Sequence, residues 1–369
     1  MGIKFDILAK DGQARAGVLH TDHGNVQTPT ITTNFTPALL RSGLNPADIK
    51  NLGVEMILVN TLHTMMEDNV QTFNVRGKLN WSGPIFADSG GFQMVSLAQH
   101  LRVKKDHIEF TWDNKKYQLS PRDILAWQKN LDIDIMMPLD RVWHLRQKNP
   151  LAYFLSVLTT EKWFQQSRGI ADDHVFYIVQ GGLNKFAREI SINYANKWLK
   201  TGTSGVAIGG LAFGESRSKM YGMIKFCTQR LPEDKPRHLL GVGHPIDLLE
   251  SIERGVDTFD CVAHTREARH GRVLTSTGYL HLKNSRYIDD DSVLESNCDC
   301  PVCQLGITRS QLRVGLKSAD LAQKRSNQIK LMLHNIRFLM RLMEQSRVAI
   351  RVGEFQRFKQ EFLSQFRSS

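Results

Sequence analysis

The sequence predicts an α/β fold, a closed (β/α)8 TIM barrel followed by a smaller zinc-binding subdomain. Three observations lead to this prediction. Eight short apolar segments recur up to residue 260, and helical patterns separate most of them. Several of these segments end in a carboxylate, an amide or a glycine. Three cysteines lie close together only after the last segment.

The eight apolar segments are short and rich in strand-forming residues, as buried parallel strands are. We expect strands at residues 28–34, 55–60, 84–88, 132–140, 174–180, 205–210, 237–243 and 256–260. Strands that alternate with helices indicate parallel pairing, and eight of them can close a barrel. An open, doubly wound sheet is the alternative, because hydrophobic periodicity does not show whether a sheet closes.

Start and stop signals place helices between the predicted strands. Ser120 and Pro121 are typical of an N-cap and a first helical turn, and Gly169 is typical of a helix end. Apolar residues from Phe186 to Trp198 recur at helical spacing with charges between them. We expect helices at residues 45–52, 120–130, 151–169, 185–200, 216–231 and 245–254.

Length and composition predict a large domain and a smaller one. The chain has 369 residues and is 41% hydrophobic, enough for a full core. We expect a catalytic barrel over residues 1–275, and a zinc-binding subdomain over 276–369 whose helices pack on the barrel.

The charge balance points to a polyanionic partner. The chain has 48 Lys and Arg against 37 Asp and Glu, a net charge of +11. Such an excess favours nucleic acid over a membrane surface. No apolar run approaches the roughly 18–20 residues of a membrane span, and the N-terminus has no apolar signal core. We therefore expect a cytoplasmic protein without a membrane partner.

The C-terminal ends of barrel strands are where functional groups gather. In this chain the predicted ends carry Asn60, Asp88, Asp140, Gln180, Gly181, Gly182, Gly209, Gly210, Gly241 and Asp260. Carboxylates that lie close together repel one another, which costs stability unless a ligand or reaction uses them. The pattern therefore predicts a functional site on this rim.

The segment from 255 to 273 combines an acid with a run of cations. It begins as a strand, ends that strand at Asp260, and continues through Arg266, Arg269 and Arg272. A carboxylate followed by a basic loop suits chemistry on a polyanion. Taken alone, the same pattern also fits a capping aspartate with solvated arginines.

A metal site is predicted after the barrel. Cys298, Cys300 and Cys303 form a Cys-x-Cys-x-x-Cys cluster, and His334 stands about thirty residues later in the apolar periodic segment 328–343. Three thiolates and one imidazole make a closed tetrahedral site for Zn²⁺. With no open coordination position, the zinc, one per chain, is expected to be structural.

Three longer motifs carry a resemblance to a known family. They are ADSGGFQ at residues 87–93, GGLAFGE at 209–215 and TFDCVAHTREAR at 258–269. Together with the cysteine cluster, they closely resemble the tRNA-guanine transglycosylases, also called queuine tRNA-ribosyltransferases, over almost the whole chain. The resemblance implies a pentosyltransferase that exchanges guanine at the wobble position of tRNA for a 7-deazaguanine base. We expect it to act as a homodimer.

The resemblance also implies a role for each matching residue. Asp260 matches the nucleophile, which would form a covalent Asp–ribosyl intermediate, and Asp88 matches the general acid/base. Asp140 and Gln180 match side chains that bind the polar edge of the base. The remaining matches are backbone contacts at Gly210 and Leu211, ring-face contacts at Phe92 and Leu240, substrate-binding support from Asn60 and Glu215, and RNA contacts from Arg266 and Arg269.

The reaction explains these residue types. Breaking an N-glycosidic bond develops oxocarbenium character, which a carboxylate on the opposite face can trap covalently. Guanine leaves poorly as an anion, so a second carboxyl group must supply and later remove a proton. The target nucleotide must leave its stack, so an aromatic face such as that of Phe92 is useful.

Some positions depart from the family pattern. His264 stands where the family has Pro, and Leu62 replaces the Tyr of an NTYHL segment. Bacterial members tend to carry Cys and Val, and eukaryotic members Val and Gly, where this chain has Val142 and Phe213. Because an inward Phe213 ring would close the space that queuine needs, we expect a preference for 7-aminomethyl-7-deazaguanine.

Two other functions stay open at this point. One is a non-catalytic RNA-binding subunit, although a scaffold has no use for both Asp88 and Asp260. The other is the same base exchange on another nucleic acid, DNA included, for which the departures leave room.

Overall fold

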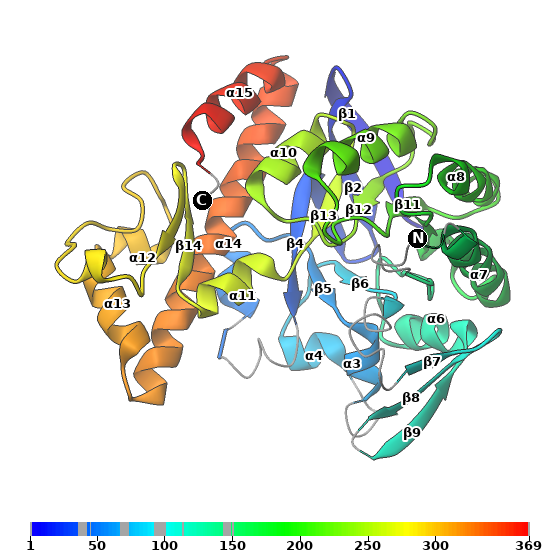
Figure 1. The fold of residues 1–369 in the computed structure, drawn as a ribbon, viewed down its shortest axis with the longest axis horizontal. Helices are drawn as coiled ribbons and strands as arrows, with labels where there is room; N and C mark the ends of the chain where they lie inside the picture. The colour runs from blue at the N-terminus through cyan, green and yellow to red at the C-terminus, as the bar shows by residue number, and fades with distance from the viewer. Residues whose placement is uncertain are drawn as a thin grey trace.

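Seven parallel strands form the main sheet of the computed structural model (Figure 1). The structure describes residues 2–35, 43–44, 46–66, 74–91, 101–112, 114–142, 149 and 151–367. In chain order these strands are β4 (Thr30–Phe35), β5 (Ile57–Val59), β6 (Ile85–Ala87), β10 (Phe176–Val179), β11 (Gly205–Ile208), β12 (Arg237–Leu239) and β13 (Thr258–Asp260). Consecutive strands pair in parallel except β6 and β10, and β13 pairs in parallel with β4.

The gap between β6 and β10 is closed by the segment 134–136. Ile135 bridges Phe86 and Met136 bridges Val175, both in parallel. Ala87 N donates to Ile135 O at 2.9 Å, and Phe176 N donates to Met136 O at 3.0 Å. The sheet is therefore a closed barrel of eight positions, as predicted, and not the open alternative.

Two predicted strands differ in extent from the observed ones. The strand expected at 132–140 is reduced to its bridging residues, since Pro138 has no N–H to continue a ladder. The strand expected at 28–34 is divided at Pro29. Its first residue ends β3 (Gly24–Thr28), which belongs to a separate antiparallel sheet.

That antiparallel sheet covers one end of the barrel. It consists of β1 (Lys4–Asp11), β2 (Ala14–Thr21) and β3. Leu19 and Val26 from this sheet pack into the same buried cluster as Leu58, Phe86 and Ile178 from the barrel strands. The barrel interior is thus filled from its N-terminal end, which leaves its opposite end for the site.

The predicted helices surround the barrel. Their bounds are α2 (Pro46–Lys50), α6 (Pro121–Asn130), α7 (Leu151–Ser167), α8 (Lys185–Leu199), α9 (Arg217–Thr228) and α10 (Pro245–Ile252). Ser120 caps α6, because its Oγ accepts from Asp123 N while Asp123 accepts from Ser120 N. Shorter elements lie beside them: α3 (Thr61–Met65), α4 (Val75–Leu79), and η2 (Asp172–His174).

Another antiparallel sheet is inserted after β6. Its strands are β7 (Leu101–Val103), β8 (Ile108–Trp112) and β9 (Lys115–Leu119). Figure 1 shows it beside α6, at the periphery of the barrel. Among the described residues, no helix combines the length and apolar character that a membrane crossing needs.

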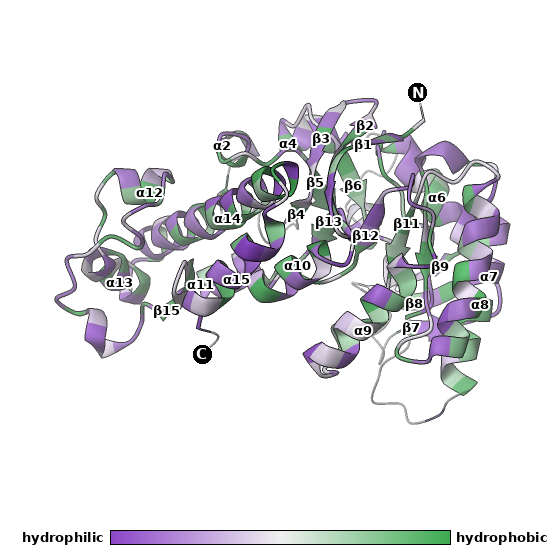
Figure 2. Cartoon of the chain, turned by 90° about the horizontal axis from the view of Figure 1, so that it is seen from above, coloured by the Kyte–Doolittle hydropathy of each residue, from purple (hydrophilic) through white to green (hydrophobic). Residues whose placement is uncertain are grey.

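The C-terminal part begins with α11 (Ala263–Arg269) and the hairpin of β14 (Arg272–Thr275) and β15 (Gly278–His281). It continues with η3 (Ser285–Tyr287), α12 (Pro301–Gln304), α13 (Arg309–Lys317), α14 (Leu321–Arg351) and α15 (Phe355–Gln365). Helix α14 contacts α11, α12 and α13 and also the strands β1, β2 and β4. In Figure 2 it is one long helix that runs from α13 to the barrel. A division near residue 275 would fall inside the hairpin and stays a prediction.

Candidate active site and metal centre

The predicted acids lie at one end of the barrel. Asp88 follows β6, Gln180 follows β10, and Asp260 is the last residue of β13. The Asp260 carboxylate is close enough to Asp88 to raise its pKa. Asp140 is joined to Gln180 and to Ser89, the neighbour of Asp88, by hydrogen bonds. The structure therefore brings these four predicted residues together.

Asp88 is held by the start of α3. Its Oδ1 accepts from Thr61 N at 2.9 Å, and its Oδ2 accepts from Asn60 Nδ2 at 2.5 Å. Burial, and to a lesser extent the nearby Asp260 charge, raise the pKa of Asp88 to about 7, although these hydrogen bonds act to lower it. The group can thus gain or lose a proton near neutral pH.

Asn60 has one defined orientation. As the N-cap of α3, it accepts from His63 N through Oδ1 at 2.8 Å, so its Nδ2 is turned to Asp88. Gln128, fully buried on α6, donates to Asp88 O at 3.2 Å and to Met137 O at 2.9 Å. The sequence reasoning missed Gln128, since a glutamine in an amphipathic helix carries no distinguishing signal.

Asp140 and Gln180 form a buried polar pair. Asp140, only 1% exposed, accepts from Ser89 Oγ and from Gln180 Nε2, each at 2.5 Å. Burial raises the pKa of Asp140 to about 6. Beside this pair, two glycines leave space that a side chain would fill. A Cβ on Gly91 would lie 2.0 Å from Asp140 Oδ1, and one on Gly210 would lie 2.6 Å from Gln180 Oε1.

Arg188 supports the loops that follow β10 and β11. Its guanidinium is fully buried and donates to the carbonyl oxygens of Val179 at 2.7 Å, Gly182 at 2.8 Å and Gly209 at 2.6 Å. It therefore ties two rim loops together. The sequence reasoning missed this role as well, because the acceptors are backbone atoms.

The loop after β11 has a fixed peptide orientation. Ala212 N donates to Glu215 Oε1 at 2.6 Å, and Phe213 N donates to Glu215 Oε2 at 2.9 Å. In a trans peptide the N–H and the preceding C=O point in opposite directions. The carbonyl of Leu211, itself buried, therefore points away from Glu215.

The structure describes one of the two residues expected at the faces of the base. Phe92 lies outside the described residues. Leu240 follows β12, is partly buried, and packs against the cluster that fills the barrel. Its contact with a base stays a prediction.

The predicted RNA-binding arginines lie on α11, directly after Asp260. Arg266 is exposed and Arg269 is partly buried. His264 on the same helix is buried, and burial lowers its pKa to about 4. A neutral histidine thus takes the position at which the family has Pro, within a helix that packs on α14.

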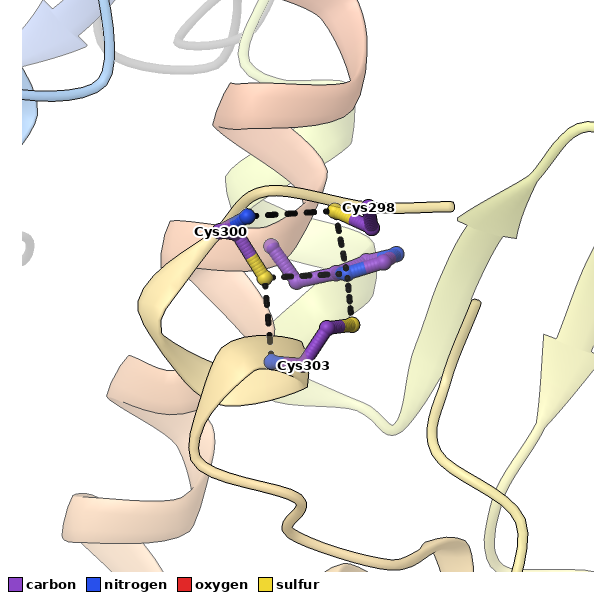
Figure 3. A group of neighbouring side chains, drawn as sticks. Cys298, Cys300 and Cys303 are labelled. Carbon is purple, nitrogen blue, oxygen red and sulfur yellow. Dashed lines mark hydrogen bonds between the residues drawn. The ribbon is translucent and has the colours of Figure 1, made fainter. Parts of the chain in front are cut away.

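The four predicted metal ligands converge. Cys298, Cys300, Cys303 and His334 are buried, and their ligand atoms lie within 4.8 Å of one another. The Sγ atoms lie 3.6, 3.4 and 3.4 Å from His334 Nδ1, and Figure 3 shows the cysteines around one point. A tetrahedral zinc with bonds of about 2.3 Å to sulfur and 2.0 Å to nitrogen places each sulfur about 3.5 Å from the nitrogen.

The second nitrogen of His334 supports the same interpretation. Its Nε2 lies 2.8 Å from Leu274 O, so Nε2 carries the proton and the Nδ1 lone pair is directed to the sulfurs. The cluster has the ligand types and the spacing of a zinc site. The residues present therefore fit a structural metal ion.

Comparisons with known proteins agree with one another. A family model described as queuine tRNA-ribosyltransferase matches residues 10–368. Proteins with that name from Herpetosiphon aurantiacus and Dictyoglomus turgidum are each 36% identical to this chain, over 99% and 98% of it and 93% and 94% of their own lengths. A protein of the same name from Francisella tularensis subsp. mediasiatica is 35% identical over 99% of both chains.

Proposed function

Because the chain belongs to the queuine tRNA-ribosyltransferase family of pentosyltransferases, we propose that it exchanges guanine at the wobble position of tRNA for a 7-deazaguanine base. The observation that carries this proposal is the pair of carboxyl groups on the rim. Asp260 ends β13, while Asp88 beside it has a pKa raised to about 7. One carboxylate and one proton donor are what the exchange requires.

The proposed reaction proceeds through two displacements. An oxygen of Asp260 attacks the ribose C1′, the bond from C1′ to the guanine nitrogen breaks, and its electron pair leaves with the base. The Asp88 carboxyl group donates a proton to the departing guanine. The resulting Asp88 carboxylate then takes a proton from the incoming base, whose nitrogen displaces Asp260 from C1′ and restores the original configuration.

Recognition of the base is assigned to Asp140 and Gln180. An ionised carboxylate has about four lone-pair positions, and the two hydrogen bonds to Asp140 leave the others for ring and exocyclic N–H groups. The glycines at 91 and 210 keep space beside the pair for a flat heterocycle. Guanine and 7-deazaguanines share this polar edge, so one site serves both half-reactions.

Within the 7-deazaguanines, we propose that the aminomethyl base is preferred over queuine. The Leu211 carbonyl, turned away from Glu215, is an acceptor suited to an ammonium group. The aromatic ring of Phe213 would take up the volume that a cyclopentenediol needs. Competition of the two bases for incorporation tests this, and Phe213→Gly should gain use of queuine. A higher kcat/KM for queuine with the unaltered chain would contradict the steric argument.

Family membership also suggests roles for two arginines and for the cysteine and histidine cluster. Arg266 and Arg269 are proposed to contact RNA beside the target nucleotide, and the four-ligand cluster is proposed to hold zinc that stabilises the C-terminal part. A homodimer and a cytoplasmic location stay predictions.

Labelled-guanine exchange into purified tRNA, with DNA as a parallel substrate, tests the function. Asp260→Ala and Asp260→Asn should abolish exchange while tRNA affinity is retained. A denaturation-resistant protein–tRNA adduct should form with the unaltered chain and not with either variant. Asp291→Asn, at an exposed position in the C-terminal part, is the matched control. Normal turnover by Asp260→Ala, or exchange into DNA alone, would overturn the proposal.

A further inference from the structure

His238 lies next to Asp260, the proposed nucleophile, on the neighbouring strand. It belongs to β12, is fully buried, and its Nε2 lies 3.1 Å from Asp260 Oδ1. Its Nδ1 lies 2.9 Å from Thr258 Oγ1. The ring is stacked on Phe86, with centroids 4.5 Å apart and planes 28° apart. Contacts on both nitrogens and on one face leave the imidazole a single orientation.

These contacts also define where the ring proton lies. An ionised carboxylate only accepts hydrogen bonds, so the Nε2 that faces Asp260 must carry hydrogen. In the neutral ring Nδ1 is then an acceptor, and the Thr258 hydroxyl can donate to it. The three side chains form a line in which Thr258 donates to His238 and His238 donates to Asp260.

A second donor reaches the same carboxylate oxygen. Gly241 N donates to Asp260 Oδ1 at 2.9 Å, in a turn where Gly241 has a φ of +76°. Within the described ranges, Asp260 Oδ2 accepts no hydrogen bond from the protein. The two oxygens of one carboxyl group are therefore unequal, because Oδ1 is anchored and Oδ2 is left for a reaction partner.

We propose that His238 is a positioning residue which, together with Gly241 N–H, anchors Oδ1 and makes Oδ2 of Asp260 the attacking atom. This inference rests on the proposed base exchange. Oδ2 forms the bond to C1′ while the bond from C1′ to guanine breaks, and the base takes its electron pair and a proton from Asp88. Oδ1 becomes the carbonyl oxygen of the ester and keeps its two donors.

The same arrangement serves the second half-reaction. When the incoming base displaces Asp260, negative charge returns to the carboxylate and the donors at Oδ1 stabilise it as a leaving group. Neither step requires His238 to lose or gain a proton. Its contribution is orientation and one charge-assisted hydrogen bond in both directions.

His238→Phe tests the proposal, because a phenyl ring keeps the stack on Phe86 and removes both nitrogens. With base exchange measured on tRNA, we expect kcat to fall on the order of tenfold to a hundredfold, while KM for tRNA changes little. His238→Gln, which can still donate to Asp260, should recover a large part of the loss. Thr258→Val should give a smaller fall, since the ring loses its second anchor.

A measurement independent of turnover accompanies these variants. Nitrogen NMR of histidine-labelled protein should show His238 as the neutral Nε2–H tautomer, and Thr258→Val should weaken that preference. Unaltered kcat in His238→Phe, a loss in His238→Gln equal to that in His238→Phe, or the Nδ1–H tautomer would each overturn the proposal. If the unaltered chain itself forms no adduct with tRNA, the proposed function fails instead.

Discussion

Replacing Asp88 with Asn should make the protein lose less stability as the pH rises, while it abolishes exchange. Burial raises the pKa of Asp88 from 3.8 to about 7, so the folded state binds this proton more tightly than the unfolded state. Stability therefore falls as the pH rises from about 4 to about 7, and removal of the carboxyl group removes that fall. A destabilising carboxylate is what a functional site, not a structural one, retains.

The magnitude follows from the pKa. Between pH 5 and the pKa of about 7, the change in the free energy of unfolding is at most roughly 2.7 kcal/mol. Because Asp88 is only partly buried, solvent screening reduces this to about 1–2 kcal/mol. The substitution also places an amide against Asn60 Nδ2, which costs about 1 kcal/mol at every pH. The change with pH, and not the absolute difference, is therefore the quantity to compare.

Urea unfolding of the unaltered chain and of Asp88→Asn at pH 5 and pH 8 measures this change in stability with pH. The stability of the variant relative to the unaltered chain should improve by about 1–2 kcal/mol over this range. Asp291→Asn should show no such change. Asp260→Asn removes one cause of the raised pKa and should shift the pH dependence of Asp88 downward. A relative stability of Asp88→Asn that is constant with pH, or that worsens as the pH rises, would refute the reasoning.

Three further predictions concern the metal, the RNA and the rim. Cys300→Ser should lower the zinc content and destabilise the C-terminal part, since structural zinc contributes on the order of 10 kcal/mol to folding at its site. Elemental analysis that finds no zinc in the unaltered chain would contradict this prediction. Arg266→Ala should raise KM for tRNA and reduce the slope of log affinity against log salt by about 1, whereas Lys200→Ala, beyond the far end of α8, should do neither. Arg188→Met leaves the carbonyl oxygens of Gly182 and Gly209 without their donor, while Val179 O still accepts from Gly209 N. It should lower the free energy of unfolding by at least about 2 kcal/mol, with a higher KM for the base. An unchanged unfolding midpoint in urea would show that the loops hold without the guanidinium.

Sequence reasoning predicted the parts of the fold whose signal is local. The apolar runs of β5 and β11 are recognisable because parallel strands are buried on both faces. The cluster of three cysteines and His334 was predictable because thiolate clusters have few uses other than metal binding. The sheet of β7, β8 and β9 was missed, since β9 has no buried residue and its sequence is typical of a polar loop.

The missed site residues have partners that are distant in sequence. Phe186 was expected on the apolar face of its helix, yet it is 69% exposed, while Arg188 in the same turn is fully buried. The burial of an arginine is stable there only because the segments that follow β10 and β11 present three carbonyl oxygens to it. His238 likewise has a role only because β12 and β13 are neighbours. No single segment carries that information.

The pairing of β13 with β4 has a consequence for biosynthesis. A ribosome delivers the chain from its N-terminus, so β4 emerges early and lacks one barrel neighbour until residue 260 has been made. Helix α14, which covers β1, β2 and β4, follows later still. The nascent protein therefore exposes an unpaired strand edge and its apolar surface for most of translation. We expect a chain that terminates before α14 to be held by chaperones or degraded, and not to persist as a free barrel.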